Sequence, residues 1–130
     1  MIVVDTSVWA AWFNGVNSVE VGRLDEALER QDAGLAPVIL TEVLQGFRSD
    51  RDLERARALL VRLPLLTLDV EGHVAAARLF RQLRRRGIAM RGAVDGIIAQ
   101  TCIAADVELL SSDRDFVAIA RHSRLRLCVE

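Results

Sequence analysis

The chain has 130 residues, of which 52% are hydrophobic, and a formal net charge of −1. This length fits one domain around one core, and so high an apolar content excludes a disordered chain. The near-zero charge excludes a domain that holds nucleic acid by bulk positive charge, so a polyanionic partner must be held by local groups.

Short apolar runs alternate with helical patterns along the chain. The apolar runs predict strands at residues 2–4, 33–36, 65–68, 107–110 and 125–129. The helical patterns predict one helix capped by Ser18, with Val21, Leu24 and Leu28 on its apolar face. They predict further helices at residues 8–13 (capped by Thr6 or Ser7), 38–47 (opened by Pro37), 52–62, 70–86, 93–104 and 113–120. Strands separated by helices predict an α/β fold, with helices on both faces of a parallel sheet.

Several sequence features that would indicate other functions are absent. All 17 basic residues are arginine, which excludes P-loop phosphate binding, Schiff-base catalysis and phosphotransfer sites that combine an aspartate with a lysine. Cys102 and Cys128 lack the spacing of a zinc site, and we expect both to pack as small core residues. No run is long enough for a membrane span and no basic leader precedes Ile2, so we expect a cytoplasmic protein without membrane contact.

Four acids fall where an open parallel sheet would gather them, beyond the carboxyl ends of its strands. Asp5 directly follows the first strand, and Asp113 follows the strand at residues 107–110. Glu42 and Asp95 lie in the first turns of two helices, each among apolar neighbours. A carboxylate in such surroundings is costly unless it is paired or binds a cation, and Mg²⁺ or Mn²⁺ prefers carboxylate and water oxygens. The pattern therefore predicts a divalent metal site.

Each acid also has a structural alternative. Asp5 and Asp113 can be N-caps of the helices that follow them, with Asp115 competing with Asp113 for the fourth place. Glu42 can face solvent, and Asp95 can be an acid favoured by a helix dipole. The joint placement of all four at one sheet edge favours the metal site over these separate explanations.

Four segments, taken together and in this order, resemble the PIN-domain toxins called VapC. They are Ile-Val-Val-Asp-Thr-Ser-Val-Trp (2–9), Pro-Val-Ile-Leu-Thr-Glu-Val-Leu-Gln-Gly (37–46), Ala-Val-Asp-Gly-Ile-Ile-Ala (93–99) and Leu-Leu-Ser-Ser-Asp-Arg-Asp-Phe (109–116). The resemblance implies one PIN domain over residues 1–130, with a Rossmann-like sheet of about five parallel strands flanked by helices. It also implies an Mg²⁺-dependent endoribonuclease toxin (Mn²⁺ as a substitute), a homodimer, and a VapB-like antitoxin that blocks the site.

By the same resemblance, individual residues take on roles. Asp5, Glu42, Asp95 and Asp113 match the catalytic, metal-binding acidic quartet, with Asp5 and Asp95 as the foremost metal ligands. The supporting residues would be Thr6, Ser7, Ser111 and Asp115. One or two Mg²⁺ ions would activate a water molecule that hydrolyses an RNA phosphodiester. The chain departs from the family at Met90-Arg91-Gly92, where a proline-containing approach is usual.

Contacts to RNA would then come from arginine, since guanidinium groups suit phosphates and stack on bases. The nearest candidates are Arg85, Arg86, Arg91 and Arg114. The alternative for those near residue 86 is a solvated helix end, where cations complement the helix dipole.

Two other functions stay open at this point. A PIN-fold nuclease can act in RNA processing or on DNA rather than as a toxin. A non-enzymatic binding module can inherit the fold, although the complete acidic quartet argues against that alternative.

Overall fold

Within residues 1–128, the sheet is parallel and has three strands. In the computed structural model, which describes residues 1–128, the strand order is β2 (Ala33–Gly34), β1 (Ile2–Val4), β3 (Glu108–Leu110). The central strand β1 sets Ile2 opposite both Ala33 and Glu108. All three residues of β1 are buried, as a strand covered on both faces requires.

Two of the five predicted strands are reduced to single parallel bridges, Leu35 with Leu65 and Leu109 with Leu127. They stand at opposite edges of the sheet, so the predicted direction of these segments is right and their length is wrong. At the first edge, the pairing is limited to the bonds that Leu35 makes with Pro64 O and Leu66 N. Leu65 is 56% exposed, so burial does not hold a longer strand there. Val129, the end of the last predicted strand, lies outside the described residues.

The helices predicted from the sequence are all found within residues 1–128, with ends that differ by up to two residues. They are α1 (Thr6–Phe13), α2 (Val19–Glu29), α3 (Pro37–Gln45), α4 (Asp50–Leu60), α5 (Val70–Arg85), α6 (Ala93–Ala105) and α7 (Asp115–Arg121). Ser18 caps α2 as predicted, accepting a hydrogen bond from Val21 N. The predicted start of the last helix at Asp113 is wrong by two residues. The predicted cap of α1 at Thr6 or Ser7 is also wrong, because both residues lie inside the helix and Asp5 is its N-cap. In this part of the chain, no helix is both long and apolar enough to cross a bilayer.

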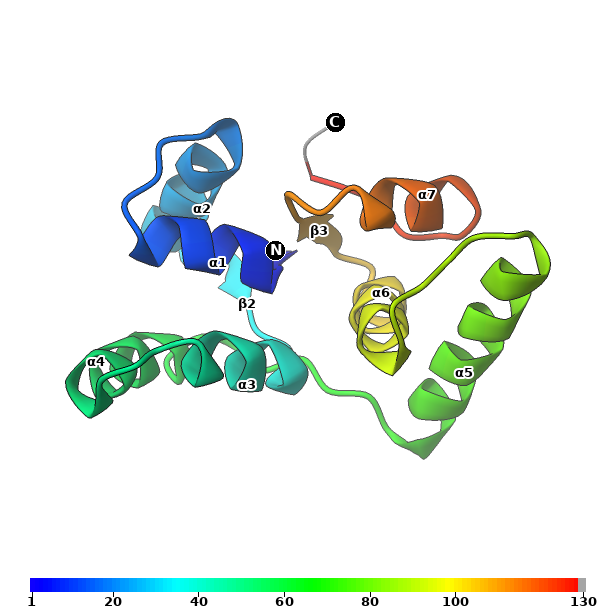
Figure 1. The fold of residues 1–130 in the computed structure, drawn as a ribbon, viewed down its shortest axis with the longest axis horizontal. Helices are drawn as coiled ribbons and strands as arrows, with labels where there is room; N and C mark the ends of the chain where they lie inside the picture. The colour runs from blue at the N-terminus through cyan, green and yellow to red at the C-terminus, as the bar shows by residue number, and fades with distance from the viewer. Residues whose placement is uncertain (129–130) are drawn as a thin grey trace.

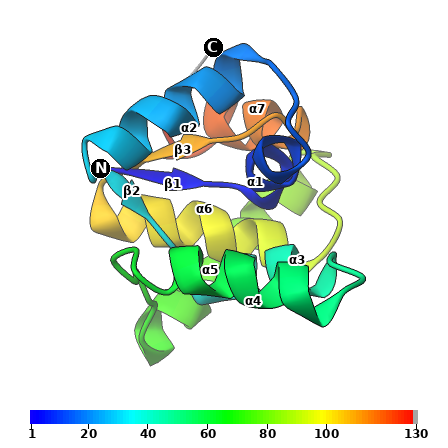
Figure 2. The same cartoon turned by 90° about the vertical axis from the view of Figure 1, so that its left-hand side faces the viewer.

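The helices lie on both faces of the sheet, as the α/β pattern predicts. Figure 2 shows α2 over one face and α6 across the other, with α3, α4 and α5 farther out on the α6 side. Figure 1 shows α5 packed beside α6 at one end of the molecule, away from α1 and α2. One continuous apolar core joins the sheet to the helices; its largest fully buried side chains include Trp9, Leu24, Ile39, Leu83, Ile98, Leu109 and Phe116.

The chain turns from β1 into α1 without a loop, and this turn is fixed to the neighbouring strand. Asp5 N donates to Leu110 O at 2.9 Å, while Asp5 O accepts the first helical bonds from Val8 N and Trp9 N. Asp5 is therefore held at the carboxyl end of β1, next to the carboxyl end of β3. This is the sheet edge where the sequence predicted the site.

Replacement of Leu109 tests the contribution of the central sheet. Leu109 is fully buried between β1 and the Leu127 bridge, so Leu109→Ala should lower the free energy of unfolding by about 2–5 kcal/mol. Urea denaturation followed by circular dichroism measures the change. The control is Val70→Ala, at a position 77% exposed, which should change stability by less than about 0.5 kcal/mol. Equal effects of the two variants would contradict this account of the core.

Candidate active site

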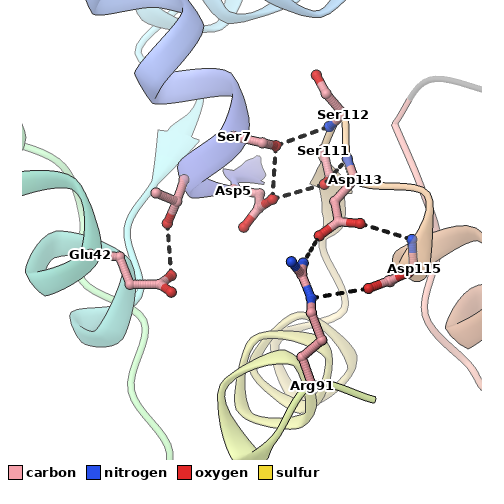
Figure 3. Close-up of polar contacts among 9 residues, drawn as sticks. Asp5, Ser7, Glu42, Arg91, Ser111, Ser112, Asp113 and Asp115 are labelled. Atoms are coloured by element: carbon pink, nitrogen blue, oxygen red, sulfur yellow. Dashed lines mark hydrogen bonds and ion pairs between the residues drawn. The ribbon is translucent and has the colours of Figure 1, made fainter. Parts of the chain in front are cut away.

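Asp5 is a buried acid whose charge is compensated by hydroxyl groups. Its side chain is only 6% exposed. Ser7 Oγ and Ser111 Oγ each donate to Asp5 Oδ2 at 2.9 Å (Figure 3). Although Asp5 is the N-cap residue of α1, its side chain accepts no capping hydrogen bond, so the simple N-cap alternative is wrong. Both hydroxyl bonds fall on Oδ2, which leaves Oδ1 for another partner.

The segment after β3 is fastened to the start of α1. Ser112 N donates to Ser7 Oγ at 3.1 Å, and Asp113 N donates to Ser111 Oγ at 3.0 Å (Figure 3). The sequence singled out Ser7 and Ser111 but missed Ser112, which takes part through its backbone. The consecutive serines after an apolar strand were the available signal, because short hydroxyl side chains readily bond nearby backbone groups.

Glu42 approaches from α3. Its Oε1 accepts a 2.8 Å hydrogen bond from Thr6 Oγ1, and its side chain is half-buried. In Figure 3, Glu42 lies on one side of Asp5, and Asp113 lies on the other. The alternative of a purely solvent-facing glutamate is therefore wrong. Thr6 and Ser7, the two predicted hydroxyl residues that directly follow Asp5, each bind a different acid.

Asp95 is the acid with the least compensation. It lies in the first turn of α6, and its Oδ2 is buried without a hydrogen-bond partner among residues 1–128. Burial raises the pKa of Asp95, and the charges of Asp113, Asp5 and Asp115 raise it further, against the opposing effect of Arg91. These charge effects put Asp95 within electrostatic reach of the other acids. A favourable helix dipole alone does not explain a buried, unpartnered carboxylate oxygen.

Asp113 and Asp115 share one cation. Arg91 Nη2 pairs with Asp113 Oδ2, and Arg91 Nε pairs with Asp115 Oδ2 at 3.1 Å (Figure 3). Asp113 Oδ1 accepts from Asp115 N at 2.9 Å, but the N-cap residue of α7 is Arg114 and no side chain caps this helix, so the alternative of Asp113 as the helix cap is wrong. The side chain of Asp113 is 22% exposed and that of Asp115 is 41% exposed. Asp113 is thus the deeper of the two acids.

The donor chemistry of this edge suits a hard divalent cation. Carboxylate oxygens come from two strand ends and two helices, and the orphaned oxygen of Asp95 is the kind of buried group that a cation would satisfy. In the described part of the chain, no three ligand-type side chains are already arranged around one ion position. Three of the four acids are instead bound by protein groups: Glu42 by Thr6, Asp5 by Ser7 and Ser111, and Asp113 by Arg91.

The four arginines predicted to contact RNA have different surroundings, and they do not form one cluster at the acids. Of these four, only Arg91 forms an ion pair with a site acid within residues 1–128. Arg86 approaches His122 Nδ1 at 3.4 Å. Arg85 lies in the last turn of α5, where a cation complements the helix dipole, and Arg114 is exposed before α7.

Neither cysteine is placed to act as a nucleophile at this site. Cys102 is fully buried, and burial raises the pKa of its thiol to about 12, so the thiolate is scarce at neutral pH. Cys128 is half-buried and accepts a contact from Arg23 Nη2 at 3.2 Å. The expectation of core packing is right for Cys102 and only partly right for Cys128.

Comparison with known proteins identifies the family. Residues 2–122 match the family described as the PIN domain, so this chain belongs to the PIN-domain family. It is 31% identical over 129 residues to a VapC ribonuclease of Mycobacterium bovis and to the ribonuclease VapC11 of Mycobacterium tuberculosis. These alignments cover 97% of this chain and 96% of each relative.

Solved structures show the same fold at lower sequence identity. VapBC2 from Rickettsia felis, bound to a DNA fragment from its promoter, matches with a TM-score of 0.78 at 17% identity, over 98% of this chain and 97% of that one. VapC20 of Mycobacterium tuberculosis, a toxin that cleaves the sarcin-ricin loop, matches with a TM-score of 0.67 at 17% identity, over 91% and 94%. The predicted α/β PIN-type fold is confirmed.

Neutralising Asp95 should stabilise the protein in the absence of metal. Because the pKa of Asp95 is raised in the folded state, this acid lowers stability as the pH rises above its ordinary, unfolded-state pKa, and the loss is complete above the raised pKa. In chelator near neutral pH, Asp95→Asn should therefore raise the thermal midpoint, by about 3 °C. Asp113→Asn is the matched comparison and should lower the midpoint, because it breaks the pair with Arg91. The same direction for both variants would argue against the difference between these acids.

Proposed function

We propose that the chain is an Mg²⁺-dependent endoribonuclease that hydrolyses RNA phosphodiester bonds, with Mn²⁺ as a substitute ion. The observation that carries the proposal is the unpartnered buried oxygen of Asp95, near enough to Asp5 and Asp113 for their charges to raise its pKa. Partly buried carboxylates that lie close together repel one another unless opposite charge compensates them, and a divalent cation prefers such oxygen ligands. The relatives named as VapC ribonucleases support the same activity.

Asp5 and Asp95 would hold the ion, and Glu42 and Asp113 would complete the acidic quartet. When bound, the ion supplies Lewis acidity, which activates water for attack and stabilises charge on the leaving oxygen. Ser7 and Ser111 orient Asp5 by donating to its Oδ2, which keeps Oδ1 free of these bonds. Thr6 fixes the carboxylate of Glu42 in the same way.

The chain's hydroxyl groups serve as hydrogen-bond donors in this scheme. Thr6, Ser7 and Ser111 are each bound to a carboxylate, and the buried Cys102 keeps its proton. No covalent intermediate with the protein is therefore required. The predicted contacts of Arg85, Arg86, Arg91 and Arg114 with RNA belong to this proposal.

We further propose that the chain is the toxin of a VapBC-type pair, with a VapB-like antitoxin and a second copy of itself as partners. Structures similar in fold are complexes of that kind from Rickettsia felis and Salmonella typhimurium. Exposed apolar side chains at Val61, Leu65 and Val70 offer surface that association would bury. The proposed RNA substrate and partner put this activity in the cytoplasm.

A cleavage assay tests the chemistry. The protein should cut RNA in Mg²⁺ and lose activity in chelator, and Asp5→Asn should reduce the rate by at least about 100-fold, since it removes a ligand charge. The control is Glu54→Gln, an exposed acid on α4, which should leave the rate unchanged. Single-stranded RNA, structured RNA and DNA are compared in parallel. Full activity of Asp5→Asn would refute the nuclease site, and a preference for DNA would favour the alternative function.

Expression in cells tests the toxin role separately. Induction of the wild-type chain should arrest growth within a few generations, and the Asp5→Asn variant should not. We expect a small antitoxin to be encoded immediately upstream, and its co-expression should restore growth. Arrest that persists with this neighbour, or an absence of arrest despite RNA cleavage in vitro, would indicate RNA processing rather than a toxin.

A further inference from the structure

Arg91 reaches the site from the segment between α5 and α6 that departs from the VapC pattern. Its guanidinium contacts Asp113 Oδ2 and Asp115 Oδ2, and Figure 3 shows it pointing up from the α6 side toward both carboxylates. These acids follow β3, more than 20 residues away in the chain. The cation is therefore brought to them by the fold and not by local sequence.

Arg91 responds to the whole acidic cluster as well as to its two direct partners. Asp113 raises the pKa of Arg91 most, followed by Asp95, Asp115 and Asp5. No other arginine within residues 1–128 forms an ion pair with one of the quartet acids. In the protein without a metal ion, this guanidinium is thus the main positive charge acting on the cluster.

We propose that Arg91 is an internal counter-ion, which pairs with Asp113 and Asp115 in the metal-free protein and competes with the divalent cation for them. The inference rests on the proposed function, because it assumes that a cation binds to the quartet. Asp113 Oδ1 is already bonded to Asp115 N, and Oδ2 is bonded to Arg91. A cation that binds Oδ2 would compete with the guanidinium for the negative charge of this carboxylate.

The surroundings of Arg91 allow such an exchange. Its side chain is 70% exposed, so little packing is lost when it leaves. It lies outside the helices, beside Gly92, which has φ +133°, a conformation that favours glycine. Ion pairs at exposed positions are weak, whereas a divalent cation brings twice the charge to the same carboxylates. The released guanidinium would be free to contact a substrate phosphate.

Mn²⁺ binding to the purified chain, without RNA, tests the inference. Titration followed by electron paramagnetic resonance should show that Arg91→Gln binds Mn²⁺ about tenfold more tightly than the wild type. Arg91→Lys keeps the charge and should stay within about threefold of the wild type. The control is Arg114→Gln, which removes an equal charge. Arg114 adjoins Asp113 in the chain but forms no ion pair within residues 1–128. The affinity of this variant for Mn²⁺ should therefore also stay within about threefold of the wild type.

Thermal unfolding gives a second readout that does not depend on activity. In chelator, Arg91→Gln should unfold at a lower temperature than the wild type, because its acids have lost their counter-ion. On addition of Mn²⁺, the thermal midpoint of Arg91→Gln should then rise more than that of the wild type. A cooperative unfolding transition also establishes that Arg91→Gln is folded. If it is not folded, Arg91→Lys, which keeps the charge, is compared with the wild type instead.

The outcomes separate this inference from the proposed function. Mn²⁺ binding by the wild type, with unchanged or weaker binding by Arg91→Gln, would overturn the counter-ion role and leave the metal site intact. An equal gain in Arg114→Gln would reduce the effect to net charge and would also overturn it. Absence of Mn²⁺ binding in the wild type and in every variant would overturn the proposed function itself.

Discussion

The carboxylate of Asp5 is buried at the end of the central strand, and the site is built around it. A buried ion must be compensated by hydrogen bonds or by opposite charge. Ser7 from α1 and Ser111 from the end of β3 both donate to it, while its backbone N–H donates to Leu110. The contacts that compensate the charge therefore also hold the two strand ends together. The shape of the site and the integrity of this sheet edge depend on the same few bonds.

The fold compensates its gathered acids in different ways. Hydroxyl groups bind Asp5 and Glu42, and the long, exposed side chain of Arg91 binds Asp113. Asp95 has a buried oxygen without a partner in the described chain, and its raised pKa records the resulting penalty. Stability alone would favour a neutral side chain at this position. An acid at this position is what a cation-binding role would require, because one added ion would satisfy several carboxylates together.

The sequence predicted the order of the elements because the helices carry their own periodicity and start signals, such as Ser18 before α2 and Pro37 at the start of α3. It predicted the edge of the sheet at which the acids meet, since Asp5 and Asp113 follow strands. It overestimated the outer strands, because an apolar run such as residues 65–68 does not reveal whether it is buried. The sequence did not predict the pairing of Arg91 with Asp113. This pairing depends on how the segment before α6 is placed against the segment between β3 and α7.

The distribution of charge, more than its sum, governs how such a chain can meet a polyanion. With a net charge of −1, the surface as a whole does not attract RNA, and the acidic cluster repels it locally. Compensation must therefore be present where the phosphate would arrive. Arg91 is both exposed and in contact with the acids, so a cation that binds the cluster would also release a guanidinium beside it. Cation binding and phosphate binding would then favour the same rearrangement, and each would strengthen the other by linkage.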